Sequence, residues 1–186
     1  CVPYLLSIII NSDQDDFNKD CSDGVFYDKL MDKLSNIKHS INYYLRSGTK
    51  TLRYDSRDDI KVMVMGSLLY GNIKNQPLLD AFYELYPVSS LHLNNLKTNN
   101  DNLSHMFFKI ESDIMLNLNL DIDFYTIHDA LCFKYEKDSK MIIDTINNKI
   151  IEMFPGCHLP KLDITINDRV IYNFDEVLNG DTDDGV

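Results

Sequence analysis

The chain has 186 residues, of which 44% are hydrophobic, so it can build one substantial domain, or one domain with a small appended lobe. Its 29 Asp and Glu residues outnumber its 18 Lys and Arg residues and give a formal net charge of -11. This balance excludes attachment to nucleic acid through bulk basic charge, so a polyanion would have to meet a local basic patch.

The four cysteines, Cys1, Cys21, Cys132 and Cys157, lie far apart and match no zinc-ligand spacing. We therefore expect free thiols in a reducing, cytoplasmic compartment. No apolar run reaches the roughly 20 residues of a membrane span, and no signal peptide is recognisable, so no membrane partner is expected. Because the chain begins with Cys1 inside an apolar stretch, we interpret it as a piece of a longer protein or as a processed chain.

Helical periodicity dominates the first part of the chain. Residues 11–20 are polar and predict a loop. Apolar residues recur at helical spacing over residues 25–37, where Asp23 and Gly24 provide starting signals. Further helices are predicted over residues 60–69, 77–85 and 103–118. Pro87 is expected to end the helix over residues 77–85.

The period then changes to that of strands. Residues 124–127 and 131–135 are rich in β-branched and aromatic residues, and residues 128–130 between them predict a tight hairpin. Asp138 is a candidate cap for a helix that continues to residue 154. Later strands are predicted over residues 162–166 and 170–174. We therefore expect an α+β fold in which helices pack against a small antiparallel sheet.

The dipeptide His128-Asp129 is the first candidate site. A carboxylate at the tip of a hairpin anchored in a core is held rigidly yet is accessible. Such a group suits Mg²⁺, which prefers a few hard oxygen ligands and lets substrate phosphates complete its shell. Taken alone, the dipeptide favours a simpler interpretation, in which Asp129 is a turn residue.

The second candidate site begins with Arg57 and Lys61, which are four residues apart and share one helical face. A guanidinium fork and an ammonium group on one face can bind a phosphate chain. Tyr70, which precedes Gly71, offers a ring for stacking on a base. Taken alone, the segment also favours a simpler interpretation, a solvated charged end on an otherwise buried helix.

Together and in this order, the two candidate sites resemble the palm and fingers of family-A DNA polymerases and their single-subunit phage-type RNA polymerase relatives. Arg57-x-x-x-Lys61 followed by Tyr70-Gly71 resembles motif B of that family, on the fingers helix. Ile127-His128-Asp129-Ala130-Leu131 resembles motif C, the palm hairpin. The resemblance covers roughly residues 4–175 and suggests a phage, plasmid or other mobile element as the source.

The resemblance implies template-directed nucleotidyl transfer with two Mg²⁺ in an intact protein that binds DNA primer-template and nucleoside triphosphates. It assigns Asp129 to the metals and His128 to the primer end. It assigns Lys61 and Arg57 to the triphosphate and Tyr70 to the side of the nascent base pair. It counts Lys61 with Asp129 and His128 as catalytic, and Gly71 as a substrate-binding residue. The implied regions are a palm-associated helical segment (1–56), a reduced fingers-like segment (57–102), a palm (103–178) and a flexible acidic tail (179–186).

Several features depart from the family pattern. The second metal-binding Asp, in motif A, is expected upstream of Cys1, so other polypeptide segments would supply it and the thumb. The spacing from Lys61 to Tyr70 is one residue longer than in the DNA polymerases, which predicts a bulge or a shifted lysine, and Ala130 replaces the usual Glu. The alternatives are a catalytically inactive polymerase-like module in protein assembly or regulation, and an unrelated α+β interaction domain.

Overall fold

The fold combines helices with short antiparallel hairpins. The computed structural model describes residues 2–12, 14–38, 40–45, 48–71, 73–99, 102–127, 130–134, 136–162, 164–166 and 169–172. In these ranges the strands form three separate two-stranded antiparallel sheets, β1-β2, β3-β4 and β5-β6. The predicted α+β class is therefore confirmed, although the strands do not join into one sheet. The predicted acidic tail, residues 179–186, lies outside the described residues.

The elements alternate between helical stretches and hairpins along the chain. The helices are α1 (Val2–Ile10), α2 (Phe17–Ser22), α3 (Phe26–Leu34), α4 (Arg57–Met63), the π-helix η1 (Val64–Leu69), α5 (Gln76–Leu85), α6 (Pro87–Asn99), α7 (Leu103–Leu116), the 3-10 helix η2 (Glu136–Asp138) and α8 (Ser139–Met153). The strands are β1 (Ile41–Leu45), β2 (Gly48–Leu52), β3 (Phe124–Ile127), β4 (Ala130–Phe133), β5 (Ile164–Ile166) and β6 (Arg169–Tyr172).

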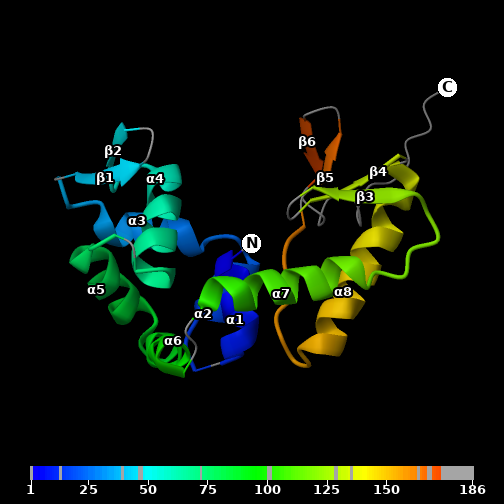
Figure 1. Ribbon diagram of the computed structural model, residues 1–186, viewed down its shortest axis with the longest axis horizontal. Coiled ribbons are helices and arrows are strands. Elements are labelled where there is room, and N and C mark those ends of the chain that lie inside the picture. Colours follow the sequence, from blue (N-terminus) through cyan, green and yellow to red (C-terminus); the bar gives the residue numbers. More distant parts are fainter. Residues whose placement is uncertain are drawn as a thin grey trace.

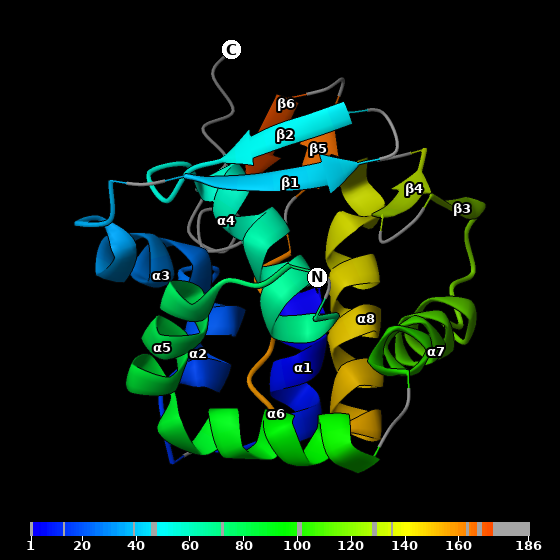
Figure 2. The same cartoon turned by 60° about the vertical axis from the view of Figure 1, so that its left-hand side comes forward.

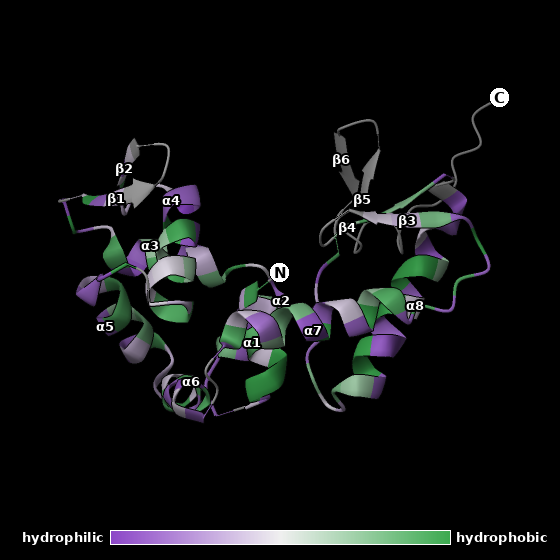
Figure 3. Ribbon diagram, viewed as in Figure 1, coloured by the Kyte–Doolittle hydropathy of each residue, from purple (hydrophilic) through white to green (hydrophobic). Residues whose placement is uncertain are grey.

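Two groups of elements lie on either side of helix α1 (Figure 1). Helices α3, α4 and α5 lie on one side with the β1-β2 hairpin, and α8 lies on the other side with the β3-β4 and β5-β6 hairpins. Helix α1 packs against α2, α6 and α7, and α7 also contacts α8. Figure 2 shows α6 crossing below α1 and α8. Hydrophobic and hydrophilic residues alternate around α5 and α8 (Figure 3), which is typical of helices with one buried face.

An aromatic cluster joins α2, α3 and α5. The Phe17 ring centroid lies 5.4 Å from that of Phe26, 5.6 Å from that of Phe82 and 5.3 Å from that of Tyr86. Such tilted and edge-on contacts add to the stabilisation from burial alone. The Tyr86 hydroxyl donates a hydrogen bond of 2.9 Å to the buried Asp20 carboxylate. The cluster therefore fixes α3, on which α4 packs.

Three elements differ from the prediction. Residues 11–20 do not form a continuous polar loop, because α2 begins at Phe17, whose ring is fully buried. Pro87 does not simply end a helix: it begins α6, where its missing N–H needs no partner and its fixed φ suits the first turn. The hairpin β1-β2, with register Ile41↔Leu52, was not predicted.

The other predicted elements occur close to their expected bounds. The predicted helix over residues 25–37 is α3, and the helix over residues 103–118 is α7. Asp138 does stand at the cap position of α8, but its side chain makes no capping hydrogen bond. Three cysteines that the structure describes, Cys21, Cys132 and Cys157, are free thiols, as predicted. Among the described residues, no helix combines the length and apolar character needed to cross a membrane.

Candidate functional site

Helix α4 carries Arg57 and Lys61, and it begins three residues earlier than predicted. Ser56 is the N-cap: its backbone is extended, and its hydroxyl accepts a hydrogen bond of 3.4 Å from the Asp59 backbone N–H. Asp58 and Asp59 follow in the first turn, where negative charge interacts favourably with the helix dipole. Ile60 on the opposite face is buried in the core. The sequence therefore fixes both the start and the orientation of α4.

The helix continues through a π-helical turn, η1, before it ends at Tyr70. The Tyr70 N–H donates to the Met65 carbonyl, five residues earlier, at 3.0 Å. Gly66 lies in this turn, and a Cβ placed on it would come within 2.4 Å of the Ile73 Cδ1 atom. Glycine is therefore the residue that lets Ile73 pack here. Gly71 then has φ of +67°, a conformation that favours glycine and turns the chain away.

The π turn places Tyr70 on the same face as Lys61. A cavity of about 260 Å³ is lined by both residues and by Val62, Met65 and Gly66 between them. Its remaining wall is Tyr43 of strand β1. A π turn, which is a one-residue bulge in an α-helix, therefore lies between Lys61 and Tyr70. The cavity combines a cation, two phenol rings and apolar side chains.

Arg57 is held by the beginning of α3. Its Nε donates to the Asp28 carboxylate at 3.0 Å, and Nη2 donates to the Gly24 carbonyl at 3.2 Å. The guanidinium carbon also lies 5.4 Å from the centroid of the Tyr27 ring, within range of a cation-π interaction. Burial raises the pKa of Tyr27, and the Arg57 charge acts in the opposite direction. Arg57 therefore links α4 to α3.

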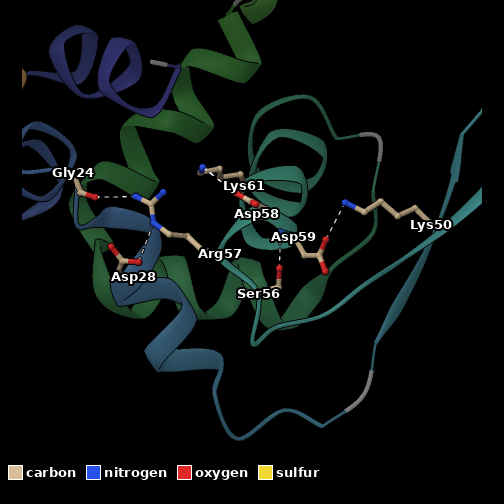
Figure 4. Close-up of polar contacts among 8 residues, drawn as sticks. All are labelled: Gly24, Asp28, Lys50, Ser56, Arg57, Asp58, Asp59 and Lys61. Atoms are coloured by element: carbon tan, nitrogen blue, oxygen red, sulfur yellow. Dashed lines mark hydrogen bonds and ion pairs between the residues drawn. The ribbon is translucent and has the colours of Figure 1, made fainter. Parts of the chain in front are cut away.

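Lys61 forms a more exposed ion pair than Arg57 does. Its Nζ lies 3.1 Å from the Asp58 carboxylate, and the two side chains are 42% and 85% exposed. Exposed ion pairs of this kind contribute about 0–1 kcal/mol. Figure 4 shows Arg57 directed toward Gly24 and Asp28, with Lys61 near its own helix. Lys61 can therefore exchange the Asp58 carboxylate for another anion at little cost.

The hairpin β1-β2 is fixed to α4 by Asp59. This carboxylate accepts from Lys50 Nζ at 3.0 Å and from the Arg53 N–H at 3.1 Å, and Figure 4 shows Asp59 pointing toward Lys50. Burial acts to raise the pKa of Asp59, but the hydrogen bonds from Lys50 and Arg53 outweigh it and the pKa is lowered. Lys50 pairs with Tyr43 across the hairpin. Asp59 thus holds the strand pair that carries Tyr43 against α4.

The hairpin predicted around residues 128–130 is present as β3 and β4. Ile127 pairs with Ala130, so the connection contains two residues, His128 and Asp129, which lie outside the described residues. The connected ends of the two strands lie toward the side that carries α4 (Figure 1). Within the described ranges, no group of three or more His, Cys, Asp or Glu residues is placed to hold a metal ion.

Comparison with known proteins adds no relative. No protein-family model, no curated protein and no solved structure matches this chain. A function is therefore inferred from the residues and their geometry.

Tyr43 is the site residue that the sequence analysis missed. Its signal was present in the segment INYYLRSGTKTL, where aromatic and β-branched residues flank a glycine. That pattern is typical of a hairpin. Without the hairpin, the second wall of the cavity was not predictable.

Proposed function

We propose that this chain is the catalytic-region part of a family-A-like DNA polymerase, which performs template-directed nucleotidyl transfer with two Mg²⁺. The observation that carries the proposal is the shared cavity of Lys61 and Tyr70 on the α4-η1 helix. These are the two residues that the motif-B resemblance assigns to the triphosphate and to the nascent base pair. The π turn brings them to one face although their spacing differs from that of the family.

In this proposal the cations of α4 bind the incoming nucleotide. Arg57 and Lys61 exchange the Asp28 and Asp58 carboxylates for triphosphate oxygens. Because both ion pairs are partly exposed, this exchange costs little. Tyr70 then lies beside the new base pair, where its ring limits the shape of the pocket. Catalysis comes mainly from positioning and from neutralised charge.

The chemical step joins the primer to the nucleotide. The primer 3′ oxygen forms a bond to the α-phosphorus, the bond from that phosphorus to the bridging oxygen breaks, and pyrophosphate leaves with the electron pair. The hydroxyl proton passes to solvent. Asp129, with an Asp from another segment, would hold Mg²⁺, which when bound supplies activation of the hydroxyl and stabilisation of the leaving group. His128 supports the primer end.

Primer extension by the intact protein tests the proposal. Asp129→Asn should lower the extension rate by roughly 100-fold or more, because a metal ligand contributes several kcal/mol to transition-state stabilisation. The matched control is Asp144→Asn, at an exposed position of α8, which should leave the rate unchanged. An intact protein that extends primers equally well with Asp129→Asn would show that the assignment is wrong.

A second candidate function is a catalytically inactive polymerase-like module that acts in protein assembly or regulation. The observation in its favour is that Arg57 and Lys61 both contact carboxylates of their own chain. In an inactive module these pairs would be permanent structural links. The two functions differ in one measurement: the inactive module binds no nucleoside triphosphate at millimolar concentration, and the polymerase does.

A further inference from the structure

The inner face of the β1-β2 hairpin covers the α4-η1 helix. Residues that alternate along β1 and β2 differ in burial: Leu52 is fully buried and Tyr43 is partly buried, whereas Asn42 and Thr51 are exposed. Since side chains of directly paired residues point to the same face, Tyr43 lies beside Lys50 on the face turned to α4. The hairpin is therefore placed with Tyr43 inward.

Two contacts with one carboxylate, that of Asp59, fix this placement. Lys50, the cross-strand partner of Tyr43, lies 3.0 Å from the Asp59 carboxylate on α4. The Arg53 N–H, one residue beyond β2, donates to the same carboxylate at 3.1 Å. Tyr43 thus stands on a strand whose partner is held at two points. A ring held in this way can form a binding surface without a large loss of conformational entropy.

The cavity between the hairpin and the helix is lined by aromatic, apolar and positively charged side chains. Tyr43 and Tyr70 line it from different elements, Val62 and Met65 add apolar surface, and Lys61 adds one positive charge. Its volume of about 260 Å³ is slightly below the roughly 300–1,000 Å³ of sites that enclose a drug-sized ligand. It therefore suits one flat ring system, with an attached phosphate chain left outside near Lys61.

We propose that Tyr43 forms the hairpin-side wall of the nucleotide pocket and contacts the base of a bound nucleoside triphosphate, with the Asp59-Lys50 pair as its positioning element. This inference rests on the proposed function, which concerns Arg57, Lys61, Tyr70 and the motif-C residues and assigns no role to Tyr43. Base stacking on an aromatic side chain tolerates all four bases, because every base presents a π face. Tyr43 thus contributes to affinity for the base and not to its identity.

Titration of the 186-residue chain with dATP, and separately with inorganic tripolyphosphate, tests the inference. Both titrations contain Mg²⁺ and are followed by amide NMR spectra, which also report whether each variant is folded. Tyr43→Ala should raise the Kd for dATP by roughly five- to 150-fold, as expected for one lost stacking contact, and should leave the Kd for tripolyphosphate unchanged. Tyr43→Phe, which keeps the ring, should retain the affinity for dATP.

Two further variants distinguish a failure of the Tyr43 inference from a failure of the proposed function. Asn42→Ala, on the outer face of the same strand, is the matched control and should bind both probes like the wild type. Lys61→Ala should weaken the binding of both dATP and tripolyphosphate. If Lys61→Ala weakens dATP binding and Tyr43→Ala does not, the Tyr43 inference is wrong and the proposed function stands. If the wild-type chain binds neither probe, the proposed function fails and the inference fails with it.

Discussion

The substitution Asp59→Asn removes the charge that joins the β1-β2 hairpin to α4. Asp59 is 8% exposed, and its carboxylate accepts from Lys50 Nζ at 3.0 Å and from the Arg53 N–H at 3.1 Å. The amide of Asn keeps one acceptor for Arg53 but gives up the charged partner of Lys50. A hydrogen bond to a charged group contributes about 1.5–3 kcal/mol, so we expect the free energy of unfolding to fall by about that amount.

The neighbouring residue provides a matched control. Asp58 lies in the same first turn of α4, so Asp58→Asn removes the same interaction with the helix dipole. Its ion pair with Lys61 is exposed, with side chains 85% and 42% accessible. We expect Asp58→Asn to lower the free energy of unfolding by about 0–1 kcal/mol. The difference between the two variants isolates the contribution of the buried contacts.

Urea unfolding measures both effects. For a slope of about 2 kcal/mol/M, Asp59→Asn should lower the midpoint by about 1 M without changing the slope. In a Lys50→Ala background the same substitution should cost much less, because the charged partner is already gone. Equal midpoint shifts for the Asp58 and Asp59 variants would refute the reasoning that burial distinguishes the two carboxylates.

The contribution of Asp59 should also depend on pH. Its pKa in the folded chain is lowered, because Lys50 and Arg53 donate hydrogen bonds to the carboxylate and outweigh burial. A lowered folded pKa means that the stabilisation is complete above the unfolded pKa, about 4, and is lost as pH falls through the folded value. The stability difference between wild type and Asp59→Asn should therefore shrink below about pH 4. A difference that stays constant down to pH 2 would contradict this explanation.

Two further predictions concern the core. Tyr86→Phe removes the hydroxyl that donates to buried Asp20 at 2.9 Å, and should cost about 1–3 kcal/mol by thermal unfolding, whereas Tyr83→Phe, at a position 38% exposed, should change little. Gly66→Ala places a Cβ 2.4 Å from Ile73 Cδ1 and should cost about 1–3 kcal/mol. An Ile73→Ala background, which lacks the clashing atoms, should remove most of that cost; equal costs in both backgrounds would contradict the steric explanation.

The sequence predicted the elements whose apolar residues have a clear period. Helices α3, α7 and α8 follow such stripes, and strands β3 and β4 follow β-rich runs. Helix α6 was missed because Pro87 indicates the end of one helix as readily as the first turn of another. Helix α2 was missed because Phe17 is its one buried hydrophobic residue and the other buried residues of this segment are polar.

Within the candidate site, only the arrangement of residues on one helix could be predicted from the sequence. The spacing of Arg57 and Lys61 on one helix follows from sequence alone. The partners of Arg57 do not, since Asp28 lies 29 residues away and Gly24 lies 33 residues away. Tyr43 reaches the cavity through a hairpin whose position depends on the Asp59 contacts. Tertiary contacts of this kind leave no periodic pattern in the sequence.

The π turn between Lys61 and Tyr70 decides which face of the helix the two side chains share. In a straight α-helix each residue turns by about 100°, so nine steps would leave the two side chains about 180° apart. The observed helix is α-helical up to Met63 and π-helical over Val64–Leu69, and the Tyr70 N–H closes the last π turn on the Met65 carbonyl at 3.0 Å. Because a π turn contains more residues than an α turn, this stretch brings Tyr70 to the face that carries Lys61. Because π turns are rare and occur frequently at functional sites, this bulge supports the assignment of that face to ligand binding.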